Sequence, residues 1–330
     1  MPTHPGVPRF AADADDLVPE AKQEFYRRVL RMLKDGGVEF MVGGAYAFTR
    51  YTGIARPTKD FDLFVRYRDL EHSLAVLAAD GFNTEFTFSH WLGKAYKDEE
   101  FVDLIFSSGN GVAAVDDQWF ENAPSAEVLG VTVRLTPPEE MIWSKSFVIE
   151  RERCDVADVL HILHACGPTL DWRRLVARYG RWWRVLMAHL VLFGFTYPGE
   201  RTKIPVKVLD AFLDRFKREL HRDASRRKLC QGTLFSRQQF LVDIERWGYE
   251  DARLDLHGGN MTAGEVDAWT AAIFDEKKPA RTARTRKEDL TPAPTSRRKP
   301  SANGKAPAKA KRAASKKPRA SKKPRASKPR

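Results

Sequence analysis

The chain has 330 residues, of which 30% are charged, and its formal net charge is +12. Residues 277–330 carry 21 Lys and Arg against two acids, a net charge of +19, which leaves residues 1–276 at −7. The positive charge therefore lies in the C-terminal segment. The whole-chain charge gives no reason to expect that residues 1–276 bind nucleic acid. The length allows about two domains of ordinary size.

The N-terminal sequence, the most apolar segment and the cysteine content narrow the class of protein further. Residues 1–20 contain no apolar stretch of the kind that a secretory signal requires. The most apolar segment, residues 185–197, includes His189 and is too short to span a bilayer. The three cysteines form no CxxC pair, so we expect reduced thiols in a cytoplasmic protein. Because neither a signal nor a membrane-spanning segment is evident, we expect no contact with membranes.

The first half of the chain alternates between helical and strand-like patterns. We expect a flexible segment over residues 1–18 and a helix from Pro19 to Gly36-Gly37. Short helices are expected over residues 45–52 and 70–79. Strands are expected over residues 38–42, 60–66, 82–88, 91–96, 101–106 and 131–135. This pattern predicts an α/β (α+β) domain over residues 19–136.

After Pro137-Pro138 the apolar period changes to that of a helix. Helices are expected over residues 138–151, 155–165, 171–194, 205–222, 236–247 and 263–276. Short Gly, Pro, Asn and Asp breaks separate them, as in a helical bundle. Residues 137–276 are therefore predicted to form a helical domain.

The segment 277–330 is built from Lys, Arg, Pro, Ala and Ser, and SKKPRA occurs at both 315–320 and 321–326. Like charges and prolines at this density cannot bury a core, so the segment is predicted to be disordered. It is similar to the C-terminal tails of linker histones and would bind nucleic acid without reading its sequence, associating with the nucleoid. A tail that only solubilises the protein is the alternative.

The strongest local pattern joins two glycines to two acids. Gly43-Gly44 lies between an expected strand and a helix, where small residues let the backbone approach a phosphate. Asp60 and Asp62 lie two apart on the next strand, so both side chains point to one face. Adjacent carboxylates favour a cation between them, and Mg²⁺ suits oxygen ligands best.

A third acid extends this pattern. Asp103 interrupts the apolar strand 101–106, and an unpaired carboxylate in a sheet is costly unless it has a role. It would complete a two-metal site with Asp60 and Asp62. Taken singly, a Gly-Gly turn or an Asp-x-Asp strand end is usually structural, but the combination in this order indicates function. Arg56 and Thr58 either contact phosphate or order the loop before Asp60.

These residues resemble a known family. The run Met41-Val42-Gly43-Gly44-Ala45, followed by Arg56-x-Thr58-x-Asp60-x-Asp62 and a later strand Asp, looks like the DNA polymerase β-type nucleotidyltransferase superfamily. It is most similar to the minimal bacterial branch that contains the AbiEii-type toxins. That branch also carries a Lys followed by an Asp pair, and here Lys145, Asp155 and Asp158 match. The resemblance covers residues 36–165.

The resemblance implies a nucleotidyltransferase fold, a mixed sheet with flanking helices, and transfer of a nucleotide from an NTP. Gly43 and Gly44 would hold the terminal phosphates. Asp60 and Asp62 would bind the Mg²⁺ that bridges them. Asp103 would help to hold a second metal ion and would activate the acceptor hydroxyl. Lys145 would neutralise phosphate charge, unless it is only a solvated helix residue.

Partners follow from the same resemblance. The acceptor would be RNA, a protein or a small hydroxylated molecule, and an antitoxin partner would fit the toxin branch, although the sequence identifies neither. A tRNA CCA-adding enzyme has a similar motif, but its downstream template motif is not evident here. The alternative function is a catalytically silent protein of this fold that acts as a nucleic-acid-binding accessory through its basic tail.

Two weaker patterns are better explained by structure. His161 and His164 lack a third metal ligand, and Trp182-Trp183 on an apolar helix is more typical of a core than of base stacking. Neither Ser144, Ser146 nor Cys154 has a nearby partner base, which excludes them as nucleophiles.

Overall fold

The computed structural model of the chain describes residue 15 and residues 18–55, 60–223, 225–256 and 258–276. These residues belong to one compact unit, Met1–Ala280. The predicted tail over 277–330 lies outside the described residues, as does the predicted N-terminal flexible segment apart from Asp15 and Val18. Arg56 and Thr58 also lie outside them.

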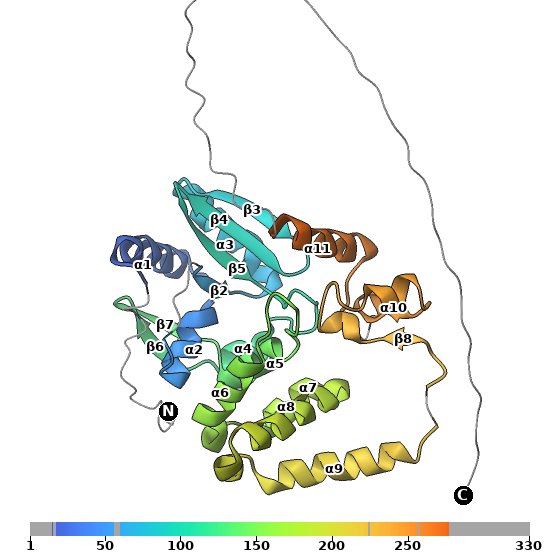
Figure 1. Cartoon of the computed structure of the whole chain (residues 1–330). Helices are drawn as coiled ribbons and strands as arrows, with labels where there is room; N and C mark the ends of the chain where they lie inside the picture. Colours follow the sequence, from blue (N-terminus) through green and yellow to red (C-terminus); the bar gives the residue numbers. More distant parts are fainter. Residues whose placement is uncertain (1–14, 16–17, 56–59, 224, 257, 277–330) are drawn as a thin grey trace, which may run out of the picture. The chain divides into compact units, whose positions relative to one another are not determined.

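Helices and strands alternate in the first half of the described chain, and helices dominate the second (Figure 1). The helices are α1 (Glu20–Asp35), α2 (Gly44–Thr52), α3 (Tyr67–Ala79), α4 (Asp117–Glu121), α5 (Pro138–Lys145), α6 (Val156–Cys166), α7 (Trp172–Tyr179), α8 (Trp183–Thr196), α9 (Val206–Leu220), α10 (Leu241–Glu245) and α11 (Ala263–Glu276). The strands are β1 (Met41–Val42), β2 (Asp62–Phe64), β3 (Asn83–Phe88), β4 (Leu92–Lys97), β5 (Glu100–Ile105), β6 (Ser125–Val128), β7 (Val131–Leu135), β8 (Leu229–Cys230) and β9 (Glu250–Asp251).

Seven strands of the described chain form one mixed sheet in the order β3-β4-β5-β2-β1-β7-β6. The pairs β5–β2 and β1–β7 are parallel, and the other neighbours are antiparallel. The predicted mixed sheet with flanking helices is therefore confirmed. Strand β6 and helix α4 were not expected from the sequence, although Leu129 and Gly130 both adopt positive φ, as the tight turn between β6 and β7 requires.

The two faces of the sheet are covered differently. Leu63 and Leu104 point into an apolar core that the sheet shares with α1 and α3. Asp62 and Asp103 are their chain neighbours, so they face the opposite side. On that side a second apolar core joins the sheet to the helical half, with members from Met41 to Ala252. The helical half therefore packs on the face of the sheet that carries the acids.

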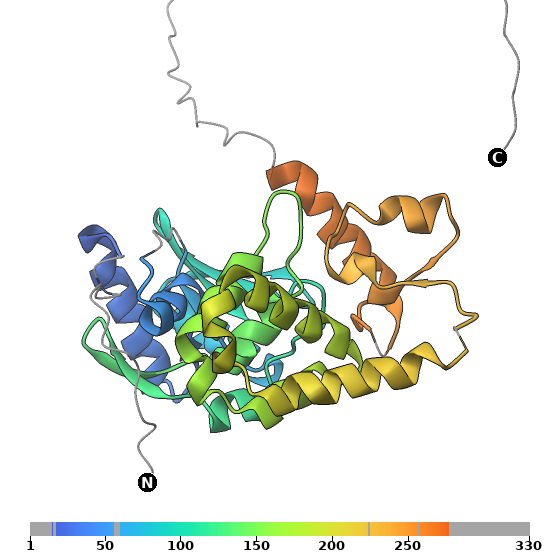
Figure 2. The same cartoon turned by 60° about the horizontal axis from the view of Figure 1, so that its bottom comes forward.

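The helical half follows the expected order with three corrections. The predicted helix 138–151 ends at Lys145, because the chain then turns back and Ile149 bridges Cys154. The predicted helix 171–194 is two helices, α7 and α8, separated at Gly180, whose φ is +46°. Helix α9 lies against α8 (Figures 1 and 2). None of the helices in the described ranges is both long and apolar enough to cross a bilayer.

The third correction concerns residues 236–247, where the predicted helix is reduced to α10 (Leu241–Glu245). The Ser236 hydroxyl accepts hydrogen bonds from the N–H groups of Gln238 and Gln239, and such local bonds compete with a helix. The side chain of Arg237 pairs with a distant residue, since its Nε lies 2.9 Å from Oε1 of Glu150. Long-range ion pairing therefore overrides the amphipathic pattern here.

Candidate active site

The glycine pair lies where β1 leads into α2, close to the predicted acids. Gly44 has a φ of +55°, and a Cβ atom on it would lie 1.7 Å from the Asp62 carboxylate. A Cβ on Gly43 would lie 2.3 Å from the ring of Phe64. Only glycine fits at either position. The start of α2 therefore approaches Asp62 closely, and the first N–H groups of this helix have no carbonyl partner within it.

Two of the acids lie side by side on adjacent strands. Strands β2 and β5 are parallel, and their register pairs Asp62 with Asp103 and Phe64 with Ile105. Paired residues of neighbouring strands point to the same face, so both carboxylates face the helical half. Asp60 precedes β2 and acts electrostatically on both carboxylates. The sheet thus brings the three predicted acids to one face.

The Asp62 carboxylate carries an unbalanced charge. Burial raises the pKa of Asp62 to about 6, and the nearby Asp103 and Asp60 add to this effect, while Arg153 and Lys145 oppose it. Among the described residues, no hydrogen-bond donor or cation pairs with this carboxylate. A half-buried, desolvated acid in this state favours a bound cation over a bare charge.

Asp103 differs from Asp62 because a lysine neutralises it. Lys94 on β4 is the register partner of Asp103, and its Nζ lies 2.7 Å from Oδ1. Burial raises the pKa of Asp103, the hydrogen bond from Lys94 lowers it, and Asp60 raises it. The sequence interpretation missed Lys94, although the signal was there. In a hairpin with a two-residue turn at Asp98 and Glu99, residue 94 must face residue 103.

Lys145, predicted to neutralise phosphate charge, is itself held by the predicted Asp pair. Its Nζ lies 2.9 Å from Asp155 Oδ2 and 2.8 Å from Asp158 Oδ2. Arg153, which sequence reasoning also missed, donates to Asp155 at 3.0 and 2.8 Å. Although burial opposes ionisation, Arg153 and Lys145 lower the pKa of Asp155. The ammonium of Lys145 is therefore fixed in position rather than solvated.

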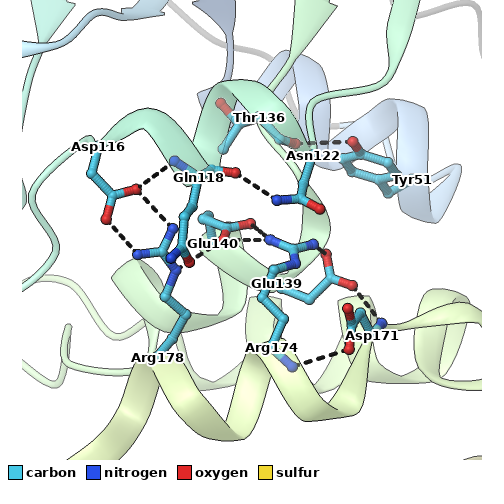
Figure 3. A network of polar contacts seen from close by, with 10 residues as sticks. All are labelled: Tyr51, Asp116, Gln118, Asn122, Thr136, Glu139, Glu140, Asp171, Arg174 and Arg178. Atoms are coloured by element: carbon cyan, nitrogen blue, oxygen red, sulfur yellow. Dashed lines mark hydrogen bonds and ion pairs between the residues drawn. The ribbon is translucent and has the colours of Figure 1, made fainter.

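A buried ion network holds the other end of the helix that carries Lys145 (Figure 3). Glu139 and Glu140 on α5 pair with Arg174 on α7, and Arg178 Nε lies 3.1 Å from Glu140. Arg178 continues to Asp116, before α4, at 2.6 Å. The Glu140 side chain is fully buried. This network ties α5 to α4 and α7, which fixes the direction from which Lys145 approaches the sheet.

A cavity of about 510 Å³ connects these features. Its wall includes Gly44, the three predicted acids, Lys94, Lys145, Arg153 and, from the C-terminal part of the unit, Arg237 and Trp269. The cavity therefore lies between the sheet and the helical half, where binding sites are common. Gly43, although it touches Phe64, is not part of this wall.

The fit of a divalent cation can be tested on these residues. Within the described ranges no group of three or more His, Cys, Asp or Glu side chains is arranged to hold a metal ion by itself. Asp60 and Asp62 nevertheless offer oxygen ligands on one cavity wall, and the unbalanced charge of Asp62 calls for a cation. Mg²⁺ usually takes one or two carboxylates and completes its shell with water and phosphate oxygens. The residues present fit such an ion.

The weaker sequence patterns have structural explanations. His161 packs edge-on against Phe48, and His164 Nε2 lies 3.1 Å from Glu200. Trp183 is 1% exposed, and its ring stacks on Phe212 with centroids 5.8 Å apart. Both patterns therefore have packing or polar contacts within the fold.

Comparisons with known proteins bear on the same segment. Residues 22–178 match the family model described as nucleotidyl transferase of unknown function (DUF2204). This segment is therefore similar to a family of nucleotidyl transferases. The match contains the glycine pair, the three acids, Lys94 and Lys145, but it ends before Arg237 and Trp269. No curated protein matches the chain.

Solved structures of nucleotidyltransferases share limited similarity with the chain. The antibiotic-resistance factor ANT(2'')-Ia is 17% identical, with a TM-score of 0.34, and the match covers 62% of this chain and 97% of that one. The lincosamide antibiotic adenylyltransferase LnuA is 14% identical, with a TM-score of 0.32, over 44% of this chain and 96% of that one. An antigenic nucleotidyltransferase-like protein from Paracoccidioides brasiliensis is 14% identical, with a TM-score of 0.31, over 51% and 90%. The substrates named for these proteins belong to those proteins.

Proposed function

We propose that the protein is a metal-dependent nucleotidyltransferase that moves an NMP from an NTP to a hydroxyl acceptor and releases pyrophosphate. One observation carries this proposal. The unpaired carboxylate of Asp62, with a pKa of about 6, lies in one cavity with Gly44, Asp60, Asp103 and Lys145. The match of residues 22–178 to a nucleotidyl transferase family supports it.

We assign a role to each residue from its position in the cavity. The start of α2 at Gly43-Gly44 would bind the β- and γ-phosphates through the N–H groups of the first turn, from Gly44 onward, and the favourable helix dipole, while the Gly43 N–H donates to the carbonyl of Asp62. Asp60 and Asp62 would hold a Mg²⁺ ion, with Asp103 contributing to a second site. When bound, such ions neutralise charge on the attacking and leaving oxygens. Lys145, held by Asp155 and Asp158, would face the triphosphate as a fixed positive charge.

In this proposal Asp103 would take the proton of the acceptor hydroxyl. The acceptor oxygen would form a bond to the α-phosphorus, while the bond from that phosphorus to the bridging oxygen breaks and pyrophosphate leaves. The hydroxyl proton would pass to the Asp103 carboxylate. Burial raises the pKa of Asp103, and Lys94, whose Nζ lies 2.7 Å away, opposes this shift and would orient the carboxylate before the acceptor binds. Arg56 and Thr58 remain candidates for phosphate contacts.

The acceptor would be RNA, a protein or a small hydroxylated molecule, and an antitoxin partner would accompany a role like that of the AbiEii-type toxins, which the glycine and aspartate motifs resemble. The alternative is a catalytically silent accessory protein that binds nucleic acid through its basic tail. It is less favoured, because a silent protein has no need to keep a half-buried carboxylate beside Asp60 and Asp103 that no described residue pairs with. Binding through the tail, residues 277–330, is compatible with either function.

The test is incubation with each α-labelled NTP, Mg²⁺ and either total RNA or a cell lysate, followed by identification of the labelled product. Asp62→Asn should abolish labelling, because it removes the ionisable ligand while keeping the shape. Asp98→Asn is the matched control. Asp98 lies in the β4–β5 turn with a φ of +58°, which Asn also adopts readily, so labelling should be unchanged. Equal labelling by the wild type and Asp62→Asn would refute the proposal.

A further inference from the structure

The cavity has an aromatic wall that the transfer chemistry does not explain. Phe88 at the end of β3, Trp91 before β4 and Trp269 on α11 all line it. The Trp269 ring meets Phe88 at 5.0 Å and Trp91 at 5.1 Å, both edge-on, while Phe88 and Trp91 stack at 5.8 Å. All three side chains are only partly buried. Figure 1 shows α11 beside β3 and β4.

Neighbouring residues fix the wall in place. A Cβ on Gly109 would lie 2.5 Å from the Trp269 ring, so the indole is seated directly against this glycine. The guanidinium of Arg237 lies 4.0 Å from the Trp269 ring centroid. Arg237 is 8% exposed, and Glu150 accepts from its Nε and Nη2 at 2.9 and 3.0 Å. The positive charge at the wall is therefore already neutralised, which leaves flat surfaces rather than an ionic site.

The wall and the phosphate end occupy different parts of the same cavity. Gly44 and Asp62 belong to the β1–β2 side of the sheet, while Phe88 ends β3 and Trp91 directly precedes β4, beyond β5. Asp103 on β5 lies between them in the strand order. Trp269 lies outside the segment that matches the nucleotidyl transferase family. The wall is thus partly built by the chain's own C-terminal region.

We propose that Phe88, Trp91 and Trp269 form a nucleobase-binding wall. The proposal rests on the proposed function, which brings a nucleotide into this cavity. Aromatic rings stack on any base, and an uncharged wall suits a base better than a phosphate. The base belongs either to the NTP or to a nucleotide acceptor.

Calorimetric titration in Mg²⁺ separates these sources. The wild type, Trp91→Leu and Trp269→Leu are titrated with α,β-methylene ATP, in which the bond that transfer would break is blocked. They are also titrated with tripolyphosphate, which offers the phosphates without a base. A third titration adds adenosine to protein saturated with tripolyphosphate. Trp247→Leu is the matched control, because Trp247 is 60% exposed and lies outside the cavity wall.

We expect both wall variants to weaken binding of adenine by about 10- to 100-fold and to leave tripolyphosphate binding unchanged. A loss with α,β-methylene ATP supports the proposal with the NTP as the source of the base. A loss confined to adenosine supports it with the acceptor as the source. No loss with either ligand, or an equal loss with tripolyphosphate, overturns it.

Two additions keep the test decisive. Trp269→Phe retains an aromatic ring against Gly109 and should restore most of the affinity, so a folding defect in Trp269→Leu cannot mimic the result. The proposed function fails separately. If no NTP labels any acceptor while adenine binding still depends on Trp91 and Trp269, the base site stands and the transferase does not.

Discussion

Two regions of the molecule bury carboxylates: the network that joins α4, α5 and α7, and the cavity face of the sheet. In the network, Glu140 is fully buried and is bound by both Arg174 and Arg178. In the cavity, the described residues leave Asp62 with no ion pair, and its pKa is raised to about 6. The fold thus neutralises its acids where they support structure and leaves one unneutralised where it lines a cavity.

The difference shows how ion pairs to buried carboxylates affect the stability of the protein. A buried ion pair adds little net stability, yet removal of one partner is costly, because it leaves the other charge uncompensated. An acid that has no partner lowers the free energy of unfolding while no cation is bound, and binding of a cation raises it again. Four changes test this contrast, from the largest expected effect to the smallest.

The first change breaks the paired region. Arg174→Met leaves Glu139 and Glu140 buried without their main partner, so the free energy of unfolding should fall by about 3–5 kcal/mol. Denaturant unfolding measures this. Lys217→Met is the control, since Lys217 pairs with Asp214 at an exposed site and its loss should change little. An Arg174 variant as stable as the wild type would show that the network is not structural.

The second change tests the unpaired acid through pH. In the folded protein Asp62 holds its proton up to a pKa of about 6, above the ordinary aspartate pKa of 3.8, so the folded state binds more protons between these values. Its contribution to stability therefore falls as pH rises from about 4 to 6. In EDTA, Asp62→Asn should be more stable than the wild type above pH 6, by up to about 3 kcal/mol.

Mg²⁺ should reduce or reverse this difference, because it binds only the wild-type carboxylate with useful affinity. The measurement is denaturant unfolding at several pH values, with and without Mg²⁺, alongside Asp98→Asn as the control for a solvated acid. A constant difference between the wild type and Asp62→Asn at all pH values would contradict the assignment of this buried charge.

The third change moves the acid rather than removing it. A Cβ in Gly44→Ala would collide with the Asp62 carboxylate, which must shift by an ångström or more. Displacements of that size cost about 100-fold in rate, and we expect this loss in transfer activity. Gly130→Ala is the matched control, because Gly130 has a φ of +74° but open space around it. It suffers the same backbone strain without the collision, so its activity should be retained.

The fourth change unpairs Asp103 and makes the two cavity acids alike. In Lys94→Met the carboxylate loses the hydrogen bond that lowers its pKa, so the acidic limb of the kcat/KM profile should move to higher pH. We expect a loss of about tenfold near neutral pH. Lys97→Met is the control on the same strand, since Lys97 pairs with Asp80 outside the cavity. Superimposable profiles for Lys94→Met and the wild type would show that Asp103 is not the titrating base.

Local pattern was enough to predict most of the sheet and the position of the acids. Gly43-Gly44 and the alternation around Asp62 are short-range features, and the structure places them where their spacing indicates. The register of β4 and β5 was also within reach, because a two-residue turn determines it. Their catalytic roles remain predictions.

Other features depend on contacts between distant residues. The early end of α5 reflects the bridge from Ile149 to Cys154, and the loss of most of the helix at 236–247 reflects the pairing of Arg237 with Glu150. The aromatic wall joins Trp91 to Trp269 across most of the chain. Pairings of this kind leave no periodic signal, so no reading of local pattern could have found them.

The turn at Asp98 and Glu99 has a consequence for how this protein can change. It pairs Lys97 with Glu100 and, through the ladder, Lys94 with Asp103, although it lies about 15 Å from the acid. One residue added to or removed from the turn would slide β5 past β4 and rotate every side chain on one of them to the other face. Surface turns usually tolerate insertions, but the length of this one determines which side chains of β4 and β5 face the cavity. Variation in length should therefore be absent at this turn and common at exposed loops that set no register.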